Sequence, residues 1–209
     1  MISRHKVFIS YYHNDDQNHK NELIKQKYYN PEKKKFESIF EDYSVNDGDI
    51  DDSNMSAESI RRLIRDKYIK EAKVLILLCG QNTRKRKHVD WEIHAAMYDS
   101  EINPKMGIVV INLPTINQSS RVADEQEKVL VYPNSTWYSY TTREEYERNY
   151  PYMPSRIIDN FVRDVPIAVI NWSRIKDNPE ILMKLIDNAF SRRKYLQYDH
   201  SAPLRKNNS

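Results

Sequence analysis

The sequence predicts an α/β fold in which a parallel sheet carries helices on both faces. Two observations lead to this prediction. Short apolar runs alternate with helical patterns along the chain, and some of these runs are apolar throughout, as strands covered on both faces are. Crossover connections of this kind make the strands parallel. The simplest arrangement is the flavodoxin-like strand order 2-1-3-4-5, which places a topological switch point between the first and third strands.

Five strands are expected from β-branched and apolar residues. The third is the clearest, because its apolar run is too short for a membrane span and ends at Gly80. The second alternates only loosely and is expected at an edge of the sheet. The five predicted ranges are His5–Tyr11, Phe36–Val45, Val74–Cys79, Met106–Leu113 and Val165–Trp172.

Helical patterns fill the intervals between these strands. Asn14 and Asp15 are good N-cap residues for a first helix, which Asn30 and Pro31 are expected to end. Three further helices are predicted: Met55–Ala72, a helix that carries Trp91 and Ala95, and Asn178–Tyr195 with Pro179 in its first turn.

The domain organisation follows from these patterns. Residues 1–198 are expected to form a single domain. Within it, residues 115–160 are polar with scattered aromatic side chains and are interpreted as an insertion on the rim. Residues 199–209 are expected to be a flexible tail.

Composition excludes several classes of function. The formal net charge is only +3, from 33 basic and 30 acidic residues, so neither nucleic acid nor an anionic membrane is predicted as a partner. The three glycines are too far apart for a P-loop or a dinucleotide fingerprint. No stretch approaches the roughly 20 apolar residues of a membrane helix. The single cysteine, Cys79, fits a reducing compartment, and a cytoplasmic location is predicted.

The predicted switch point brings two loops together. One follows the first strand at Ser10, and the other follows the third strand at Gly80. Glu92 lies one turn into the next helix and is expected to face Ser10 and Tyr11 across a crevice. Two simpler readings stay open: Glu92 can be a first-turn carboxylate favoured by the helix dipole, and Ser10 can be a helix cap. His88 and Glu92 have the spacing of a metal pair, but a third ligand is missing nearby, so no metal site is predicted.

Two segments resemble the TIR-like domains of bacteria, in particular the TIR-like subunit of the Thoeris anti-phage system. They are KVFISYYHNDD near the N-terminus and a G-x-x-T motif followed by basic residues and V-D-W-E-I-x-x-A. The resemblance spans roughly Lys6–Leu113 and implies a TIR-like variant of the flavodoxin-like fold. It also implies cleavage or cyclisation of NAD at the nicotinamide–ribose bond, with NAD as substrate and no further cofactor. Glu92 would be the essential carboxylate, and Phe8, Ser10 and Tyr11 would lie beside the nicotinamide and its ribose.

The chemistry is reasonable without the family. Nicotinamide leaves without a proton from an acid, and its departure leaves an oxocarbenium-like ribose that a single carboxylate can stabilise. Water as acceptor gives ADP-ribose, whereas a group of the same molecule gives a cyclic product. Arg84 is a candidate contact for the pyrophosphate and Asp47 for a ribose. Each of these two side chains has a solvated surface position as its simpler reading.

We therefore expect an NAD glycohydrolase or ADP-ribosyl cyclase. Its product, a cyclic ADP-ribose-type signal, would activate a separate effector protein in anti-phage defence, and assembly into a homo-oligomer is compatible with this role. The main alternative is a catalytically silent TIR-like module that works by protein–protein interaction. A phosphoacceptor receiver domain is disfavoured, because Cys79 stands where such a domain needs an aspartate.

Overall fold

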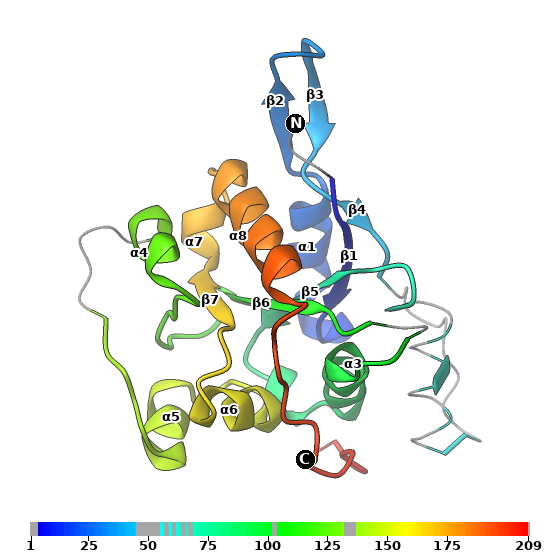
Figure 1. Cartoon of the computed structure of the whole chain (residues 1–209), viewed down its shortest axis with the longest axis vertical. Helices are drawn as coiled ribbons and strands as arrows, with labels where there is room; N and C mark the ends of the chain where they lie inside the picture. The colour runs from blue at the N-terminus through cyan, green and yellow to red at the C-terminus, as the bar shows by residue number, and fades with distance from the viewer. Residues whose placement is uncertain are drawn as a thin grey trace.

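The computed structural model describes residues 4–44, 55–56, 59, 62–63, 66, 69–101, 104–131 and 137–208. At its centre is a five-stranded sheet in which every strand pair is parallel (Figure 1). The order β4-β1-β5-β6-β7 is the predicted 2-1-3-4-5 order, so the flavodoxin-like α/β fold is confirmed. The strands are β1 Lys6–Ser10, β4 Glu41–Asp42, β5 Val74–Cys79, β6 Gly107–Asn112 and β7 Ala168–Asn171.

The three central strands are buried because their side chains are apolar on both faces. All six residues of β5 are buried, and β5 pairs with β1 through Phe8 opposite Leu75 and Ser10 opposite Leu77. On its other side, Leu77 lies opposite Val110 of β6. This register places the carboxyl ends of β1 and β5 side by side, which is where the sequence places the switch point.

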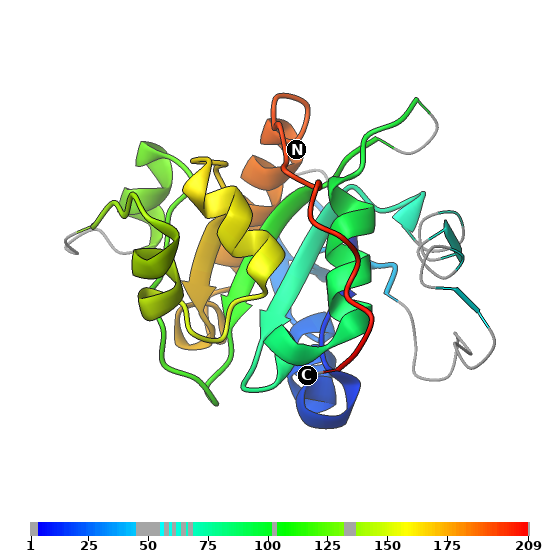
Figure 2. The same ribbon diagram turned by 90° about the horizontal axis from the view of Figure 1, so that it is seen from below.

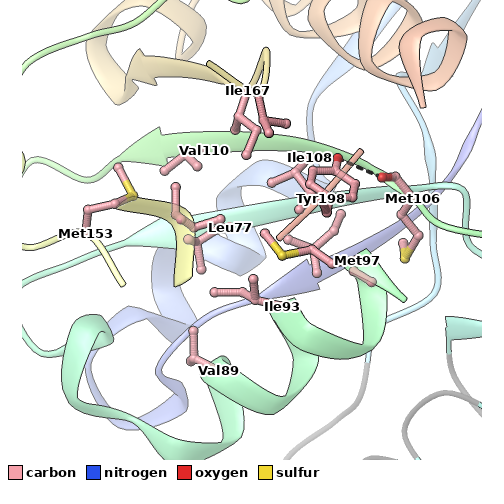
Figure 3. Packing of buried hydrophobic residues seen from close by; sticks show 14 of the residues in the cluster. Leu77, Val89, Ile93, Met97, Met106, Ile108, Val110, Met153, Ile167 and Tyr198 are labelled. Atoms are coloured by element: carbon pink, nitrogen blue, oxygen red, sulfur yellow. Dashed lines mark hydrogen bonds between the residues drawn. The ribbon is translucent and has the colours of Figure 1, made fainter. Parts of the chain in front are cut away.

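Helices cover both faces of the sheet, as predicted. One face carries α3, α5 and α6, and the other carries α1, α7 and α8 (Figures 1 and 2). Residues four apart on α3, namely Val89, Ile93 and Met97, lie on the side of the helix that faces the sheet (Figure 3). The helices are α1 His13–Ile24, α3 Lys87–Met97, α4 Glu125–Val131, α5 Arg143–Asn149, α6 Ser155–Val162, α7 Trp172–Ile175 and α8 Pro179–Arg192.

A close approach between α8 and β6 explains one of the three glycines. A Cβ atom on Gly107 would lie 2.1 Å from the backbone oxygen of Ala189 in α8. Only glycine leaves room for the helix backbone at this point of the strand.

The first helix is shorter than predicted. It ends at Ile24, and residues Lys27–Asn30 form strand β2 of an antiparallel hairpin with β3, Lys35–Ser38. The predicted end of the helix at Asn30 and Pro31 was therefore wrong. Asn30 instead forms a turn, because its side-chain oxygen accepts the backbone N–H groups of Glu32 and Lys33. The hairpin projects from the body of the molecule (Figure 1).

Two other local predictions fail in the same region. Tyr12 occupies the N-cap position of α1 and makes no side-chain cap, so Asn14 and Asp15 do not have the predicted role. The second strand predicted over Phe36–Val45 is divided between the hairpin and the two-residue edge strand β4. The predicted helix Met55–Ala72 lies partly outside the described residues, and Asp47 lies outside them altogether.

The segments predicted as insertion and tail are more closely packed than expected. Tyr150, Ile157 and Phe161, at α5 and α6, are buried in the core, so these helices are not a rim insertion. The apolar spacing over Ile157–Phe161 is that of a short amphipathic helix. The flexible tail expected from residue 199 onward is also contradicted for residues 199–208, which lie along α3 and α6 (Figure 2).

In the part of the chain that the structure describes, no helix combines the length and the apolar character that crossing a membrane requires.

Candidate active site

A buried contact between Ser10 and Glu92 lies at the switch point. Ser10 is the last residue of β1, and Glu92 is the sixth residue of α3. The Ser10 hydroxyl donates a hydrogen bond of 2.6 Å to Oε2 of Glu92. Ser10 is fully buried and Glu92 is only 7% exposed. The structure thus brings together the two residues that the sequence analysis places on either side of a crevice.

The environment of Glu92 favours its neutral form. Burial raises the pKa of the Glu92 carboxyl to about 8, and the hydrogen bond from Ser10 acts in the opposite direction because it favours the ionised form. A carboxyl group with this pKa is largely protonated at pH 7. A cationic ligand beside it would favour the carboxylate, so ligand charge and the protonation of Glu92 are coupled.

A second bridge joins the same two loops through Arg86, which stands in the same basic run as the predicted Arg84. The guanidinium of Arg86 lies over the ring of Tyr12, 3.7 Å from its centroid. Arg86 immediately precedes α3, and Tyr12 follows Ser10 by two residues. The Nε atom of Arg86 is buried and has no hydrogen-bond partner among the described residues. An arginine with an unpaired donor near the switch point suits an anionic group such as a phosphate.

The G-x-x-T motif packs the loop after β5 against helix α1. Thr83 Oγ1 accepts the backbone N–H of Gly80 at 2.9 Å and lies 3.4 Å from the carboxylate of Asp16 in α1. A Cβ atom on Gly80 would come within 2.7 Å of both Asp16 oxygens, so glycine is needed for this contact. Beside it, Asn82 donates to Asp15 at 2.8 Å. Burial raises the pKa of Asp16 to about 6. The motif therefore serves the packing of loop against helix.

The remaining predicted site residues are placed differently. Phe8 is fully buried in the core, and Tyr11 is buried with its ring stacked on His13 at 4.3 Å. Arg84 donates to the backbone oxygen of Pro151 at 3.0 Å and thus contacts the α5–α6 region. The structure does not bring Arg84 to the Ser10–Glu92 contact, and Asp47 is not described. Their roles as substrate contacts stay predictions.

Two other chemistries find no support in the geometry. Burial raises the pKa of the Cys79 thiol to about 12, which makes it a poor nucleophile at neutral pH. His88, which the sequence analysis considered as a metal ligand, packs edge-on against Trp91 with 5.0 Å between the ring centroids. Within the ranges that the structure describes, no group of three His, Cys, Asp or Glu side chains is arranged to hold a metal ion.

The strand order, the contacts of the G-x-x-T motif and the buried Ser10–Glu92 contact are consistent with the TIR-like class of domain that the sequence resembles. A family model described as "Thoeris protein ThsB, TIR-like domain" matches residues 8–118, a little over half of the 209 residues. The chain therefore belongs to the Thoeris ThsB TIR-like family, which supports a role in Thoeris defence. No curated protein matches the chain in sequence.

Proposed function

We propose that this protein cleaves NAD at the nicotinamide–ribose bond and releases a cyclic ADP-ribose-type signal for a separate effector. The observation that carries the proposal is the 2.6 Å contact between Ser10 and Glu92 at the switch point of the sheet. Ligands of open α/β sheets bind at such points, beyond the carboxyl ends of the strands. Membership of the ThsB family adds to this argument.

In this mechanism Glu92 acts as a carboxylate. The C1′–N bond breaks, and its electron pair leaves with the nicotinamide ring, which becomes neutral. The positive charge that develops on the ribose is stabilised by the ionised Glu92. Water then attacks C1′ and loses a proton to give ADP-ribose, or a nucleophilic atom of the adenine end attacks to give a cycle. Ser10 orients the carboxylate and supports its ionised form through its hydrogen bond.

The rate of cleavage is expected to rise with pH. Because Glu92 must lose its proton before it can stabilise a cation, kcat/KM for NAD should increase about tenfold per pH unit below its pKa and level off above about pH 8. Ser10→Ala removes a hydrogen bond that favours the ionised form of Glu92. The rise in kcat/KM should therefore occur at higher pH in this variant. Nicotinamide release measured between pH 5.5 and 9.5 tests both expectations. A rise in kcat/KM centred near pH 4.5, or the same pH profile in Ser10→Ala as in the wild type, would contradict this role of Glu92.

Arg86 and Arg84 provide a matched pair for locating the anionic part of the substrate. Arg86→Ala is expected to raise KM for NAD about tenfold or more with a smaller change in kcat, because the guanidinium stacked on Tyr12 keeps an unpaired Nε–H donor. Arg84→Ala should change KM less than twofold, since its guanidinium is bound to Pro151. Steady-state kinetics of both variants show which of the two arginines binds the anionic part of the substrate. A larger effect at Arg84 would reverse the assignment and restore the prediction made from sequence.

The interaction-module alternative makes a different prediction for the unaltered protein. It predicts no release of nicotinamide at any pH, even when NAD is present at high concentration and the protein is assembled with its defence partners. Chromatography of the reaction mixture also distinguishes ADP-ribose from a cyclic product.

A further inference from the structure

The C-terminal segment at residues 199–208, here called the C-terminal strap, lies along the helix that carries Glu92 (Figure 2). It begins at two firm anchors. The buried Tyr198 hydroxyl donates to the backbone oxygen of Met106 at 2.9 Å (Figure 3). Asp199 then exchanges two hydrogen bonds with the side chain of the buried Asn160 in α6. The strap is thus attached to the core before it reaches α3.

Three hydrogen bonds connect the strap to α3 itself. The backbone N–H of Arg205 donates to Asp90 at 3.0 Å, and the backbone oxygen of Arg205 accepts from the Trp91 indole at 2.8 Å. The third bond caps the helix. Arg86 at the N-cap position makes no side-chain cap, but Asn208 accepts the N–H of Lys87, the first helical residue, at 2.8 Å.

A buried arginine ties the strap, α3 and α6 into one unit. Arg156 of α6 is 2% exposed and binds both carboxylate oxygens of Asp90, at 3.0 and 3.1 Å. The same guanidinium donates to the backbone oxygens of Ala202 and Pro203 in the strap. Bidentate pairs of this kind fix orientation as well as distance.

These contacts give the consecutive residues Asp90, Trp91 and Glu92 complementary roles. The first two bind the strap, and the third binds Ser10 of β1. Because successive residues point in different directions around a helix, contacts on both sides determine how α3 is rotated and where along its axis it sits. The position of the Glu92 carboxyl group depends on both the rotation of α3 and its location along the helix axis.

We propose that the C-terminal strap positions the Glu92 carboxylate for the reaction, with Asp90 and Trp91 as positioning residues. This inference rests on the proposed NAD cleavage for its kinetic consequence, but not for its structural one. A displacement of about 1 Å in a reacting group can lower a rate about a hundredfold. Loss of the strap should therefore lower kcat more than it changes KM.

The test is a chain that ends at Asp199, compared with the full chain and with Ile186→Val. Ile186 is a core residue on the opposite face of the sheet, so its substitution lowers stability without touching α3. For the truncated chain we expect unchanged far-ultraviolet circular dichroism, at least tenfold faster hydrogen exchange of α3 amides, and a kcat reduced at least tenfold with KM within about threefold. Ile186→Val should leave the exchange of α3 amides and kcat unchanged.

A second variant keeps the proposal testable if the truncated chain does not fold. Trp91→Phe keeps a six-membered aromatic ring and removes the indole N–H that binds Arg205, together with the pyrrole half of the ring. It should also speed the exchange of α3 amides and lower kcat, by a smaller factor than the truncation. Unchanged exchange, or an unchanged kcat beside faster exchange, would overturn the positioning role. Failure of the full chain to release nicotinamide would instead count against the proposed function, and hydrogen exchange alone would then decide whether the strap holds α3.

Discussion

Glu92→Gln is expected to lower nicotinamide release from NAD by about a thousandfold or more. Glutamine keeps the size of the side chain and can still accept the hydrogen bond from Ser10, but it cannot become the anion that stabilises the charge on the ribose. The measurement is single-turnover release of nicotinamide at pH 8.5, where the wild-type carboxyl is ionised. The control is Glu144→Gln, which removes an exposed carboxylate in α5. Similar rates for wild type and Glu92→Gln would exclude Glu92 from the mechanism.

The same substitution should make the protein more stable at alkaline pH. The pKa of Glu92 is raised from 4.5 to about 8 in the folded protein, so the folded state holds a proton that the unfolded state has lost. Between these two pH values the free energy of unfolding falls as pH rises, by roughly 3 to 5 kcal/mol in total. Glutamine carries no such penalty.

Thermal unfolding at two pH values tests this expectation. At pH 8.5 the melting temperature of Glu92→Gln should exceed that of the wild type by roughly 10 °C, and near pH 4.5 the two should nearly coincide. Equal melting temperatures at both pH values would show that the carboxyl does not titrate in this range. A substitution that raises stability and abolishes activity is typical of a residue whose role is in function and not in folding.

Gly107→Ala is expected to be the most destabilising single substitution proposed here. The new Cβ atom would lie 2.1 Å from the oxygen and 2.4 Å from the carbonyl carbon of Ala189, and both are backbone atoms that no rotamer change can move. Helix α8 would have to move away from β6, which opens the core on that face. We expect a loss of about 3 kcal/mol or more, and a melting temperature lower by roughly 6 to 12 °C.

Ala189→Gly, added to Gly107→Ala, provides the control. It removes the side chain of Ala189 but not the backbone atoms that clash, so it should not restore stability. Differential scanning calorimetry of both variants measures the effect. A melting temperature within about 2 °C of the wild type would show that α8 can accommodate the methyl group.

Much of the sheet could be predicted from sequence because its central strands are apolar on both faces. Strand β5 was predicted with its observed bounds, Val74–Cys79, and β6 within one residue at each end. The hairpin was missed because Leu23, Ile24, Lys27 and Tyr28 continue a helical spacing. Which of the two patterns forms depends on the turn at Asn30 and on neighbouring structure, and local periodicity does not contain that information.

Part of the candidate site could likewise be predicted from sequence, and part of it could not. Glu92 could be placed opposite Ser10 because strand order alone makes the ends of β1 and β5 neighbours. The choice of arginine could not be made in this way, since Arg84 and Arg86 stand in one basic run. The short 3-10 helix Thr83–Lys85 turns Arg84 toward Pro151, while Arg86 meets Tyr12. Only the three-dimensional path of this loop separates them.

The central position of β1 also has a consequence for biosynthesis. This strand leaves the ribosome before its main partner β5, which begins at Val74, and β6 and β7 follow later still. The apolar side chains of β1 therefore lack their sheet partners until those strands have been made, and such nascent chains are prone to aggregate. Slow growth at low temperature, or a surplus of chaperones, should raise the yield of native protein more than any change of buffer after lysis.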